Sequence, residues 1–322
     1  MTRAIRFETF GGPEVLQYRE IELAPPAAGE ARVAHRAIGV NFIDVYHRTG
    51  LYPLALPSGL GGEGAGVVTA VGAGVAHVRA GDRVAYTAGT LGSYADERNV
   101  EAHRLVKLPA SIDEKTGAAM MLKGLTAWYL LKRSYKVVAG DWVVLYAAAG
   151  GVGLIAAQWA SALGARVIGI VSTPAKRELA LAAGCERVLL DGDDVPARVR
   201  EIAGGGVPAV YDSVGRTTFF QSLDCLRPHG VLVSFGNSSG KVEPFGLHEL
   251  TRRGSLYVTR PTLQDFIRER SALEAASGEL FEIVGGGRVK IEVHQTYALR
   301  DAATAHRDLE ARRTTGCTVL TP

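Results

Sequence analysis

A regular alternation of strand-like and helix-like segments between residues 142 and 259 constrains the fold of this 322-residue chain more than any other feature. The apolar, β-branched runs indicate strands: WVVLYAA, RVIGIVS, ERVLL, AVYDSVG, VLVSFG and SLYVT. The segments between the first five indicate helices: GGVGLIAAQWASALG, PAKRELALAAG, VPARVREIAGG and TFFQSLDCLRPHG. Strands and helices that alternate on short connections predict an α/β fold with a doubly wound parallel sheet.

Two glycine-rich segments resemble a dinucleotide-binding loop. GLGGEGAG at residues 59–66 matches the pattern G-x-G-x-x-G letter for letter, whereas AAAGGVGL at residues 147–154 matches it less well. The pattern is meaningful only where a strand precedes it and a helix follows it. The first segment follows the proline-containing YPLALPS and leads into a strand, so its match is accidental. The second meets both conditions, which predicts that Gly150 and Gly151 let a pyrophosphate approach the helix N-terminus and that Gly153 packs the helix against the sheet.

The end of the second predicted strand favours NADP over NAD. Proteins that bind NAD usually carry Asp or Glu there, to bond the 2′-hydroxyl of the ribose. In this chain the strand ends in IGIVSTPAKR, and Ser172, Thr173, Lys176 and Arg177 stand where the acid would be. Hydroxyls and a cation bind a 2′-phosphate, which a carboxylate would repel. The alternative is that Lys176 and Arg177 are only the solvated face of the next helix.

The rest of the chain predicts a second, β-rich domain, since 322 residues exceed what one hydrophobic core usually serves. Short β-branched runs punctuated by Gly, Pro and Asp occur at residues 31–40, 66–75, 81–88 and 103–109. Residues 113–135 are helical in composition, and Gly117 and Gly124 predict a break within that helix. The tail after Thr262 reads as helix, strand, helix and strand, and we expect it to return to the first domain.

Composition excludes several classes of protein. A net charge of +3 and 21% charged residues, with no basic stripe, argue against nucleic-acid binding. The three cysteines, Cys185, Cys225 and Cys317, form no C-x-x-C pair and predict neither disulfides nor a zinc ribbon. The uncharged run at residues 142–165 is interrupted by glycines, so we interpret it as strand, turn and helix rather than a membrane span. No signal peptide is visible at the N-terminus, and we expect a cytoplasmic protein without a membrane segment.

Several longer motifs give the chain a family resemblance. They are GGPEVL at 11–16, GVNFIDVYHRTGLYP at 39–53, LKGLTAWYLL at 122–131, AAAGGVGLIAAQWA at 147–160, YDSVG at 211–215, SFGNSSG at 234–240 and SLYVTRP at 255–261. The chain resembles the zinc-free quinone oxidoreductases, the zeta-crystallin type, of the medium-chain dehydrogenase/reductase superfamily. The resemblance implies a Rossmann domain at residues 124–261 and a GroES-like catalytic domain at residues 1–123 and 262–322. It also implies NADPH in the cleft between them and a homodimer that pairs edge strands near Ser255–Val258.

The resemblance further implies a set of site residues. Asn41 and Tyr46 would face the nicotinamide, and Tyr52 would lie in the substrate pocket. The remaining cofactor contacts would be Lys123, Thr126, Gly150, Gly151, Val152, Ser172, Thr173, Lys176, Phe235, Gly236, Asn237, Ser238, Thr259, Arg260, Pro261 and Arg312. Two positions depart from the family pattern: Asp191 replaces a common Tyr on the adenine side, where an acid weakens the preference for NADP, and His47 replaces an apolar residue.

The same motifs predict that no metal is bound. Zinc-dependent relatives carry GVCHTD and GHEGAG where this chain has GVNFID and GGEGAG, so Asn41 and Gly62 occupy two zinc-ligand positions and Leu122 the third. None of these side chains is a Cys, His or carboxylate ligand. We expect the adjacent Glu63 to be a structural hydrogen-bond partner and His47, next to Tyr46 in an extended segment, to lie on the surface.

Without a Lewis acid, the site suits an acceptor that takes hydride unaided. The sequence therefore predicts an NADPH:quinone oxidoreductase, in which Tyr46 and Tyr52 offer aromatic walls and hydroxyl donors to a flat substrate. One alternative is an NADPH-dependent alkenal or enone reductase, which would use the same hydride. Another is a non-enzymatic NADPH-binding or nucleic-acid-binding protein. The physiological acceptor, the proton donor, the number of electrons transferred and the choice between dimer and tetramer stay open.

Overall fold

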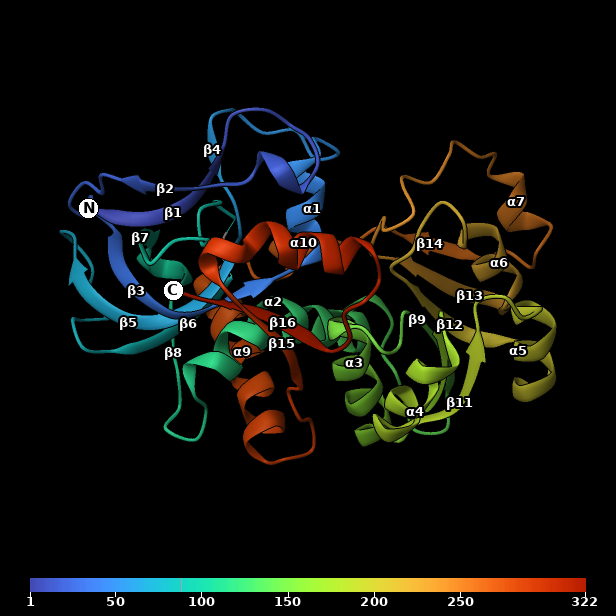
Figure 1. The fold of residues 1–322 in the computed structure, drawn as a ribbon. Helices are drawn as coiled ribbons and strands as arrows, with labels where there is room; N and C mark the ends of the chain where they lie inside the picture. Colours follow the sequence, from blue (N-terminus) through green and yellow to red (C-terminus); the bar gives the residue numbers. More distant parts are fainter. Residues whose placement is uncertain (88) are drawn as a thin grey trace. The chain divides into compact units, whose positions relative to one another are not determined.

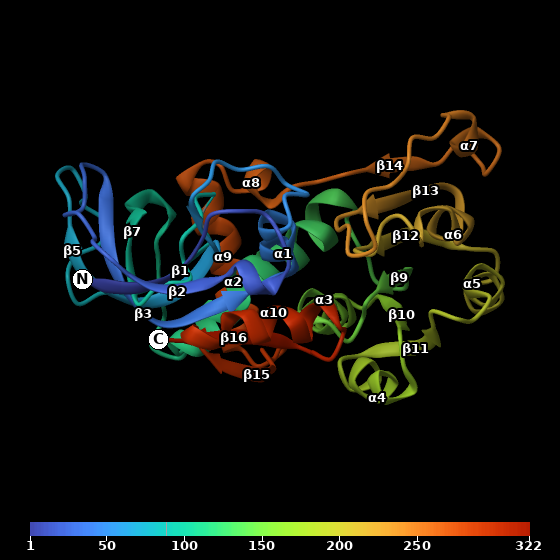
Figure 2. The ribbon, with the colours of Figure 1, turned by 45° about the horizontal axis from the view of Figure 1, so that its top comes forward.

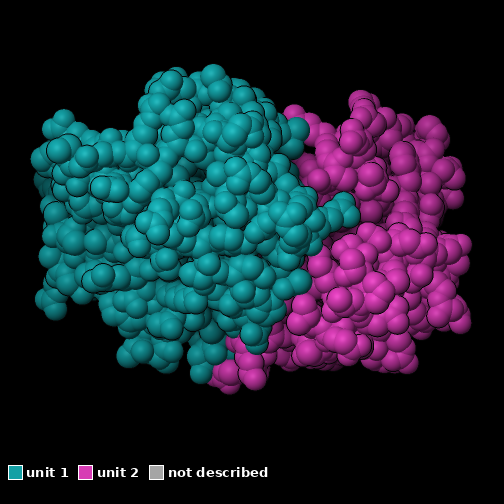
Figure 3. All heavy atoms as spheres, viewed as in Figure 1, with its two compact units in different colours: residues 1–123, 267–285, 291–322 teal, residues 124–266, 286–290 magenta. Residues whose placement is uncertain are grey.

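The computed structural model describes residues 1–87 and 89–322, which divide into two compact units. Unit 1 comprises residues 1–123, 267–285 and 291–322, and unit 2 comprises residues 124–266 and 286–290 (Figure 3). The units therefore separate at residue 123 and again at residue 266, five residues beyond the boundary expected at 261. A short stretch of the tail, residues 286–290, is grouped with unit 2. The extent of the two domains as expected from the family stays a prediction.

Unit 2 is built on a six-stranded parallel sheet with the strand order β11-β10-β9-β12-β13-β14 (Figure 1). The strands are β9 (Trp142–Tyr146), β10 (Arg166–Val171), β11 (Cys185–Leu190), β12 (Val207–Asp212), β13 (Leu226–Ser234) and β14 (Tyr257–Thr259). The helices are α3 (Gly151–Ala162), α4 (Pro174–Ala182), α5 (Val195–Ala203), α6 (Phe219–Asp224), α7 (His248–Thr251) and α8 (Leu263–Phe266). This order, two halves that diverge from β9 and β12, is that of a doubly wound dinucleotide-binding sheet. The predicted fold of this region is confirmed.

Helices cover both faces of this sheet, which explains why its strands are apolar throughout. Helix α3 packs against α4, α5 packs against α6, and the two pairs lie on opposite faces (Figure 2). Every residue of β12 is buried, as are Val143–Tyr146 of β9. A strand buried on both faces reads as a continuous hydrophobic run rather than an alternating one. The core of unit 2 includes Val144, Ile168 and Val210, each fully buried.

Unit 1 is β-rich, with a larger and a smaller sheet. The larger sheet has the order β15-β16-β3-β5-β6-β8, with β7 also paired to β3, and the smaller has the order β2-β1-β4. The strands are β1 (Thr2–Phe7), β2 (Gln17–Ile21), β3 (Glu30–Val40), β4 (Ser58–Gly59), β5 (Glu63–Val71), β6 (Arg83–Thr87), β7 (Glu97–Glu101), β8 (Val106–Lys107), β15 (Val293–Ala298) and β16 (Cys317–Thr321). The C-terminal β16 pairs antiparallel with β3. The tail therefore does return to the first part of the chain.

The helices of unit 1 correct one expectation. They are α1 (Phe42–Arg48), α9 (Arg270–Gly285), α10 (Ala302–Glu310) and the first part of α2 (Glu114–Tyr129), with short 3-10 turns η1 (Pro13–Val15), η2 (Ala102–Arg104) and η4 (Leu299–Asp301). Helix α2 runs through Gly117 and Gly124 without the expected break and then ends in a π turn, η3 (Leu130–Ser134). A Cβ at Gly117 would lie 3.0 Å from Leu108 and 3.3 Å from Ala65, so this glycine serves close packing.

Two further element boundaries differ from the sequence-based expectation. The segment LRPHG belongs to β13 rather than to the preceding helix, because Leu226 pairs with Val207 of β12 before the register shifts. The single long helix expected after Thr262 is two helices, α8 and α9, separated at residues 267–269. In both places tertiary pairing and packing override a locally helical composition.

Candidate active site

The predicted dinucleotide loop of unit 2 has the geometry of an anion site. Strand β9 ends at Tyr146, and α3 begins at Gly151 with Gly150 as an extended N-cap that carries no side-chain cap. The first turn contains no acidic residue, so its backbone N–H groups and the positive end of the helix dipole are available to a phosphate. A Cβ at Gly153 would lie 2.3 Å from the carbonyl oxygen of Ala147. Only glycine therefore lets the helix begin this close to the turn.

The end of β10 presents the polar groups expected to hold a 2′-phosphate. Ser172 and Thr173 follow the strand, and Thr173 is the N-cap of α4. The Lys176 Nζ lies 3.4 Å from the Ser172 Oγ, which places the ammonium group over this turn. The backbone N–H of Asp191 donates to the carbonyl of Val171 at 3.0 Å. The backbone of Asp191, the exposed acid that departs from the family pattern, therefore lies next to the same turn.

Asp212, at the end of β12, organises the third loop at this edge of the sheet. It is fully buried and accepts hydrogen bonds from the N–H of Val214 at 2.7 Å and from the hydroxyls of Thr218 at 2.7 Å and Ser222 at 2.8 Å. Its own carbonyl accepts from the N–H of Phe235 at 2.8 Å. Sequence reasoning missed this residue, although an acid that ends a wholly apolar strand was a usable signal.

The loop after β13 is held against the loop after β12. The N–H of Ser238 donates to the carbonyl of Ser213 at 3.3 Å, and a Cβ at Gly236 would lie 2.3 Å from that same oxygen. In a parallel sheet the strands' carboxyl ends meet at one edge. The structure thus brings together most of the predicted unit 2 residues there: Gly150, Gly151, Val152, Ser172, Thr173, Lys176, Phe235, Gly236, Asn237, Ser238, Thr259, Arg260 and Pro261. Thr126, the remaining one, is buried within α2.

In unit 1, the predicted catalytic residues gather on and beside α1. Tyr46 is buried in this helix. Its ring packs edge-on against that of Tyr52 at a centroid distance of 5.1 Å and is tilted against that of Phe42 at 5.5 Å. The backbone N–H of Tyr52 donates to the carbonyl of Tyr46 at 3.1 Å. The two tyrosines expected to form the substrate pocket are therefore one packed unit.

His47 does not have the environment expected of it. The segment is helical rather than extended, and the imidazole ring packs edge-on against Tyr52 at a centroid distance of 6.0 Å. The side chain is half-buried, its Nδ1 atom is buried, and desolvation lowers the pKa of His47. His47 is therefore more enclosed than the expected surface residue, because the turn of α1 places it beside the chain that returns through Tyr52, although part of the side chain stays exposed.

A buried carboxylate joins the residues that occupy the zinc-ligand positions of the relatives. Glu63 is fully buried, and its Oε2 accepts from the Nδ2 of Asn41 at 2.8 Å and lies 3.4 Å from the Nζ of Lys123. Its Oε1 accepts from the N–H of Leu122 at 2.6 Å. A Cβ at Gly39 would lie 2.2 Å from Oε2, so Gly39 leaves room for the carboxylate. The expectation that Glu63 is a structural hydrogen-bond partner is confirmed.

A second buried chain of hydrogen bonds runs from α10 to α1. Arg48 pairs with Glu310 at 2.7 Å and donates to the Nδ1 of His306 at 3.1 Å. Burial lowers the pKa of His306 to about 3, so the ring is neutral and its proton is on Nε2, which contacts the Tyr94 hydroxyl at 3.1 Å. Tyr94 in turn donates to the Oδ2 of Asp44 at 2.9 Å. Sequence reasoning missed this network, because its members are far apart in the chain.

Asp44 ends this network. Its Oδ2 also accepts from the backbone N–H of Asn41 at 2.9 Å, whereas its Oδ1 is buried without a hydrogen-bond partner among residues 1–87 and 89–322. Burial raises the pKa of Asp44 to about 7, an effect that its hydrogen bonds with Asn41 and Tyr94 only partly oppose. The carboxyl group next to Asn41 is thus poised between its two protonation states near neutral pH.

Two further predictions concern Arg312 and the absence of a metal. Arg312 follows α10 with a positive φ of 57°, and its assignment to the site stays a prediction. Within the described part of the chain, no cluster of three or more His, Cys, Asp or Glu side chains could hold a metal ion. That the protein binds no metal also stays a prediction, which depends on the identities of Asn41, Gly62 and Leu122.

Comparison with known proteins assigns the chain to a family. Residues 27–110 match the model of the alcohol dehydrogenase GroES-like domain, and residues 151–272 match that of the zinc-binding dehydrogenases. A quinone oxidoreductase of Pseudomonas aeruginosa is 51% identical over 100% of both chains. A 2-haloacrylate reductase of a Burkholderia species is 43% identical over 97% of this chain and 96% of that one.

A solved structure agrees with this relationship. The crystal structure of Escherichia coli quinone oxidoreductase complexed with NADPH has a TM-score of 0.98 and 50% identity, over 99% of this chain and 100% of that one. Among the described residues, no helix combines the length and apolar character needed to cross a membrane. The chain belongs to the quinone oxidoreductase family of the medium-chain dehydrogenase/reductase superfamily.

Proposed function

We propose that this protein is an NADPH-dependent quinone oxidoreductase. The observation that carries the proposal is the edge of the unit 2 sheet, where an uncapped, glycine-lined helix N-terminus lies beside a β10 end that bears Ser172 and Lys176 instead of an acid. This donor set fits a dinucleotide with a 2′-phosphate. The support from relatives is a set of quinone oxidoreductases about half identical over the full chain, one of them crystallised with NADPH.

The residues of unit 2 are proposed to bind NADPH, which supplies a hydride when bound. The N–H groups at Gly150–Val152 would hold the pyrophosphate, and Ser172, Thr173 and Lys176 the 2′-phosphate. The loop at residues 235–238, fixed through Asp212 and Ser213, would contact the ribose and nicotinamide. Lys123, Thr126, Thr259, Arg260, Pro261 and Arg312 would complete the cofactor contacts.

The residues of unit 1 are proposed to orient the acceptor. The packed rings of Tyr46 and Tyr52 form an aromatic surface suited to a flat, conjugated molecule, and their hydroxyls are donors for a quinone oxygen. Asn41, held by Glu63 and Asp44, would fix the nicotinamide end. Amide, hydroxyl and ammonium donors would thus stabilise the charge that develops on the acceptor.

The experiment that tests this function is NADPH oxidation by purified protein with 1,2-naphthoquinone, followed by the loss of absorbance of the reduced cofactor. We expect turnover with NADPH well above that with NADH. A titration of the protein with each cofactor, without acceptor and followed by cofactor fluorescence, gives the affinities for NADPH and NADH. Equal affinities for NADPH and NADH, or no turnover with a panel of quinones, would contradict the proposal.

A second candidate is an NADPH-dependent enone or alkenal reductase. It is favoured by the 43% identity to a 2-haloacrylate reductase, whose named substrate is an activated alkene. Both candidates use the same cofactor site, so only kcat/KM values for matched quinone and enone panels separate them. A non-enzymatic NADPH-binding or nucleic-acid-binding role predicts cofactor binding with no turnover of either panel.

We also propose that the protein is a homodimer paired through β14. This strand is at the edge of the unit 2 sheet, and Tyr257 on it is 61% exposed. An open strand edge with an exposed aromatic side chain is a template for pairing with a second copy. Location in the cytoplasm stays an expectation.

A further inference from the structure

Glu63 is not among the residues assigned to the cofactor or the acceptor, yet it contacts two of them. Its Oε2 is 2.8 Å from the Asn41 amide and 3.4 Å from the Lys123 ammonium, and it is fully buried. We propose that Glu63 is a positioning residue, which holds Asn41 and Lys123 as one unit and balances the charge of Lys123. The proposal rests on the NADPH-binding function proposed above.

The carboxylate is the link between two separate parts of unit 1. Asn41 lies at the junction of β3 and α1, Lys123 lies on α2, and both contact the same oxygen of Glu63. The other oxygen accepts from the N–H of Leu122, which fixes the orientation of the carboxylate plane. Removing the carboxylate would therefore release the amide and the ammonium together.

Burial makes the charge balance of this pair important. The side chains of Glu63 and Lys123 are 0% and 7% exposed, so water screens them little. Loss of Glu63 alone makes the charge beside the nicotinamide-binding residues more positive, and loss of Lys123 alone makes it more negative; below pH 7 the neighbouring Asp44 is mainly protonated and does not offset either change. The nicotinamide ring is positively charged in NADP⁺ and neutral in NADPH. The ratio of the dissociation constants for NADP⁺ and NADPH therefore reports the sign of the local charge.

The test compares Glu63→Gln, Lys123→Met and the double variant, with both dissociation constants measured by calorimetry without any acceptor. We expect Glu63→Gln to raise the NADP⁺/NADPH ratio of dissociation constants about tenfold and Lys123→Met to lower it. The double variant should return to within about threefold of wild type, because the pair is neutral again. Direct contacts of Lys123 with the cofactor affect both redox forms and cancel in the ratio.

Glu114→Gln is the matched control. Glu114 is on α2, the helix that also carries Lys123, but its carboxylate accepts a hydrogen bond from Arg83 at 2.9 Å and not from Asn41 or Lys123. It should leave the ratio unchanged. If Glu63→Gln does not fold, the comparison of Lys123→Met with the double variant isolates the same carboxylate.

The proposal is overturned if the NADP⁺/NADPH ratio of dissociation constants is the same in wild type and Glu63→Gln. It is also overturned if Glu114→Gln changes this ratio as much as Glu63→Gln does. If this happens while wild type still reduces quinones, the proposed function stands and only the role of Glu63 fails. If wild type binds NADPH without reducing any quinone, the proposed function fails and the ratio still decides on Glu63. A wild-type protein that binds no NADPH overturns both.

Discussion

Asp44 couples folding to pH near neutrality. Its pKa is raised by burial from an ordinary 3.8 to about 7. Between these values the folded protein holds a proton that the unfolded chain has released. The free energy of unfolding therefore falls as the pH rises from about 4 to about 7, by up to about 4 kcal/mol from this group.

The variant Asp44→Asn should remove this dependence. An asparagine Oδ1 can still accept from the Asn41 N–H and the Tyr94 hydroxyl, and it does not titrate. We expect the melting temperature of the variant to match that of wild type near pH 4 and to exceed it increasingly as the pH rises to 8. The buried His35 and His306 are common to both proteins, so they cancel in the difference. Parallel curves from pH 5 to pH 8 would show that Asp44 ionises normally.

The 2′-phosphate site can be tested by two opposite charge changes. Lys176→Ala should weaken NADPH binding by roughly tenfold and leave NADH binding unchanged, because a charge-assisted hydrogen bond to phosphate is lost. Asp191→Asn should strengthen NADPH binding severalfold, since its backbone begins beside the same turn. Lys115→Ala removes an exposed charge from α2 and is the control. If a substitution changes the affinities for NADPH and NADH by the same factor, the assignment of this turn to the 2′-phosphate is wrong. Fluorescence titration gives the affinities of wild type and of the three variants for NADPH and for NADH.

At the scale of elements, the contact of α3 with the turn before it depends on Gly153. A methyl group there would meet the Ala147 carbonyl at 2.3 Å and Ala148 at 2.8 Å, and neither backbone atom can move cheaply. Gly153→Ala should therefore shift α3, lower the melting temperature and weaken NADPH binding by tenfold or more. Gly192→Ala, where a Cβ meets nothing within 4 Å, should change neither quantity. Equal behaviour of the two variants would contradict the close-approach explanation.

The sequence predicts the elements of unit 2 well because strong local signals agree there. Pro174 at the start of α4 and glycines after α3 and α4 mark the ends of helices between wholly apolar strands. The same reasoning fails at α1 and α2. Tyr46 and His47 were expected in an extended segment, and Gly117 was expected to break a helix. At Gly117 the outcome depends on a neighbour distant in sequence, Ala65, which lies 3.3 Å from the position of a Cβ there.

The candidate site was predictable to the extent that its chemistry is local. The loop at Gly150, the turn at Ser172 and the role of Glu63 as a hydrogen-bond acceptor all follow from short motifs. The network from Arg48 to Asp44 does not, because Arg48 and His306 are 258 positions apart and meet only when α10 packs on α1. No single-residue pattern encodes such a long-range pairing.

At the scale of the whole molecule, the chain leaves unit 1, builds unit 2 and returns. The return brings β16 onto β3, so unit 1 cannot complete its larger sheet until the C-terminus has been made. Unit 2 has the opposite character, with a strand order built from consecutive segments and one edge strand, β14, that follows a long connection from β13. The segment before β14 must be held in one position if this edge strand is to pair with a second copy of the chain.

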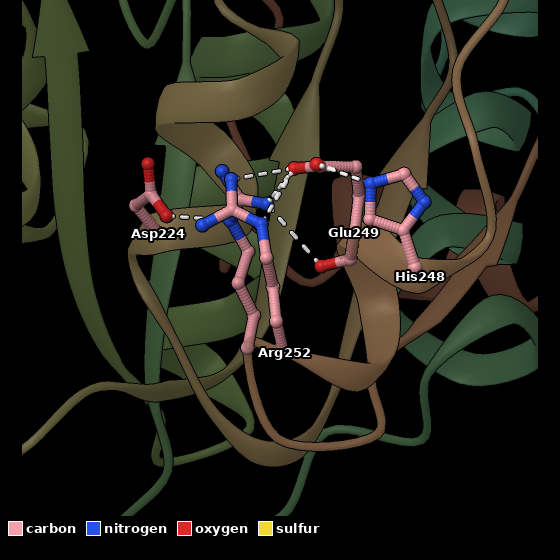
Figure 4. A network of polar contacts seen from close by, with 5 residues as sticks. Asp224, His248, Glu249 and Arg252 are labelled. Carbon is pink, nitrogen blue, oxygen red and sulfur yellow. Dashed lines mark hydrogen bonds and ion pairs between the residues drawn. The ribbon is translucent and has the colours of Figure 1, made fainter.

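An ion-pair network anchors the segment before β14. Figure 4 shows Glu249 between His248 and Arg252, with Asp224 across the network. Glu249 pairs with Arg252 at 2.6 Å and with Arg253, which also reaches Asp224 at 2.6 Å. Hydrogen bonds from Arg252 and Arg253 lower the pKa of Glu249 to about 2. These contacts tie α7 and the turn that follows it to the end of α6.

The proposed dimer can be tested at this edge. Tyr257→Lys places a charge on the exposed face of β14, which should prevent a second copy from pairing there. We expect wild type to have twice the chain mass by light scattering after size exclusion, and the variant to have the mass of one chain with an unchanged circular dichroism spectrum. Val138→Lys, at another exposed apolar residue of unit 2 (53% exposed), should stay dimeric. A monomeric wild type would contradict the proposed dimer. A Tyr257→Lys protein that remains a dimer at micromolar concentration would show that the interface is not at β14.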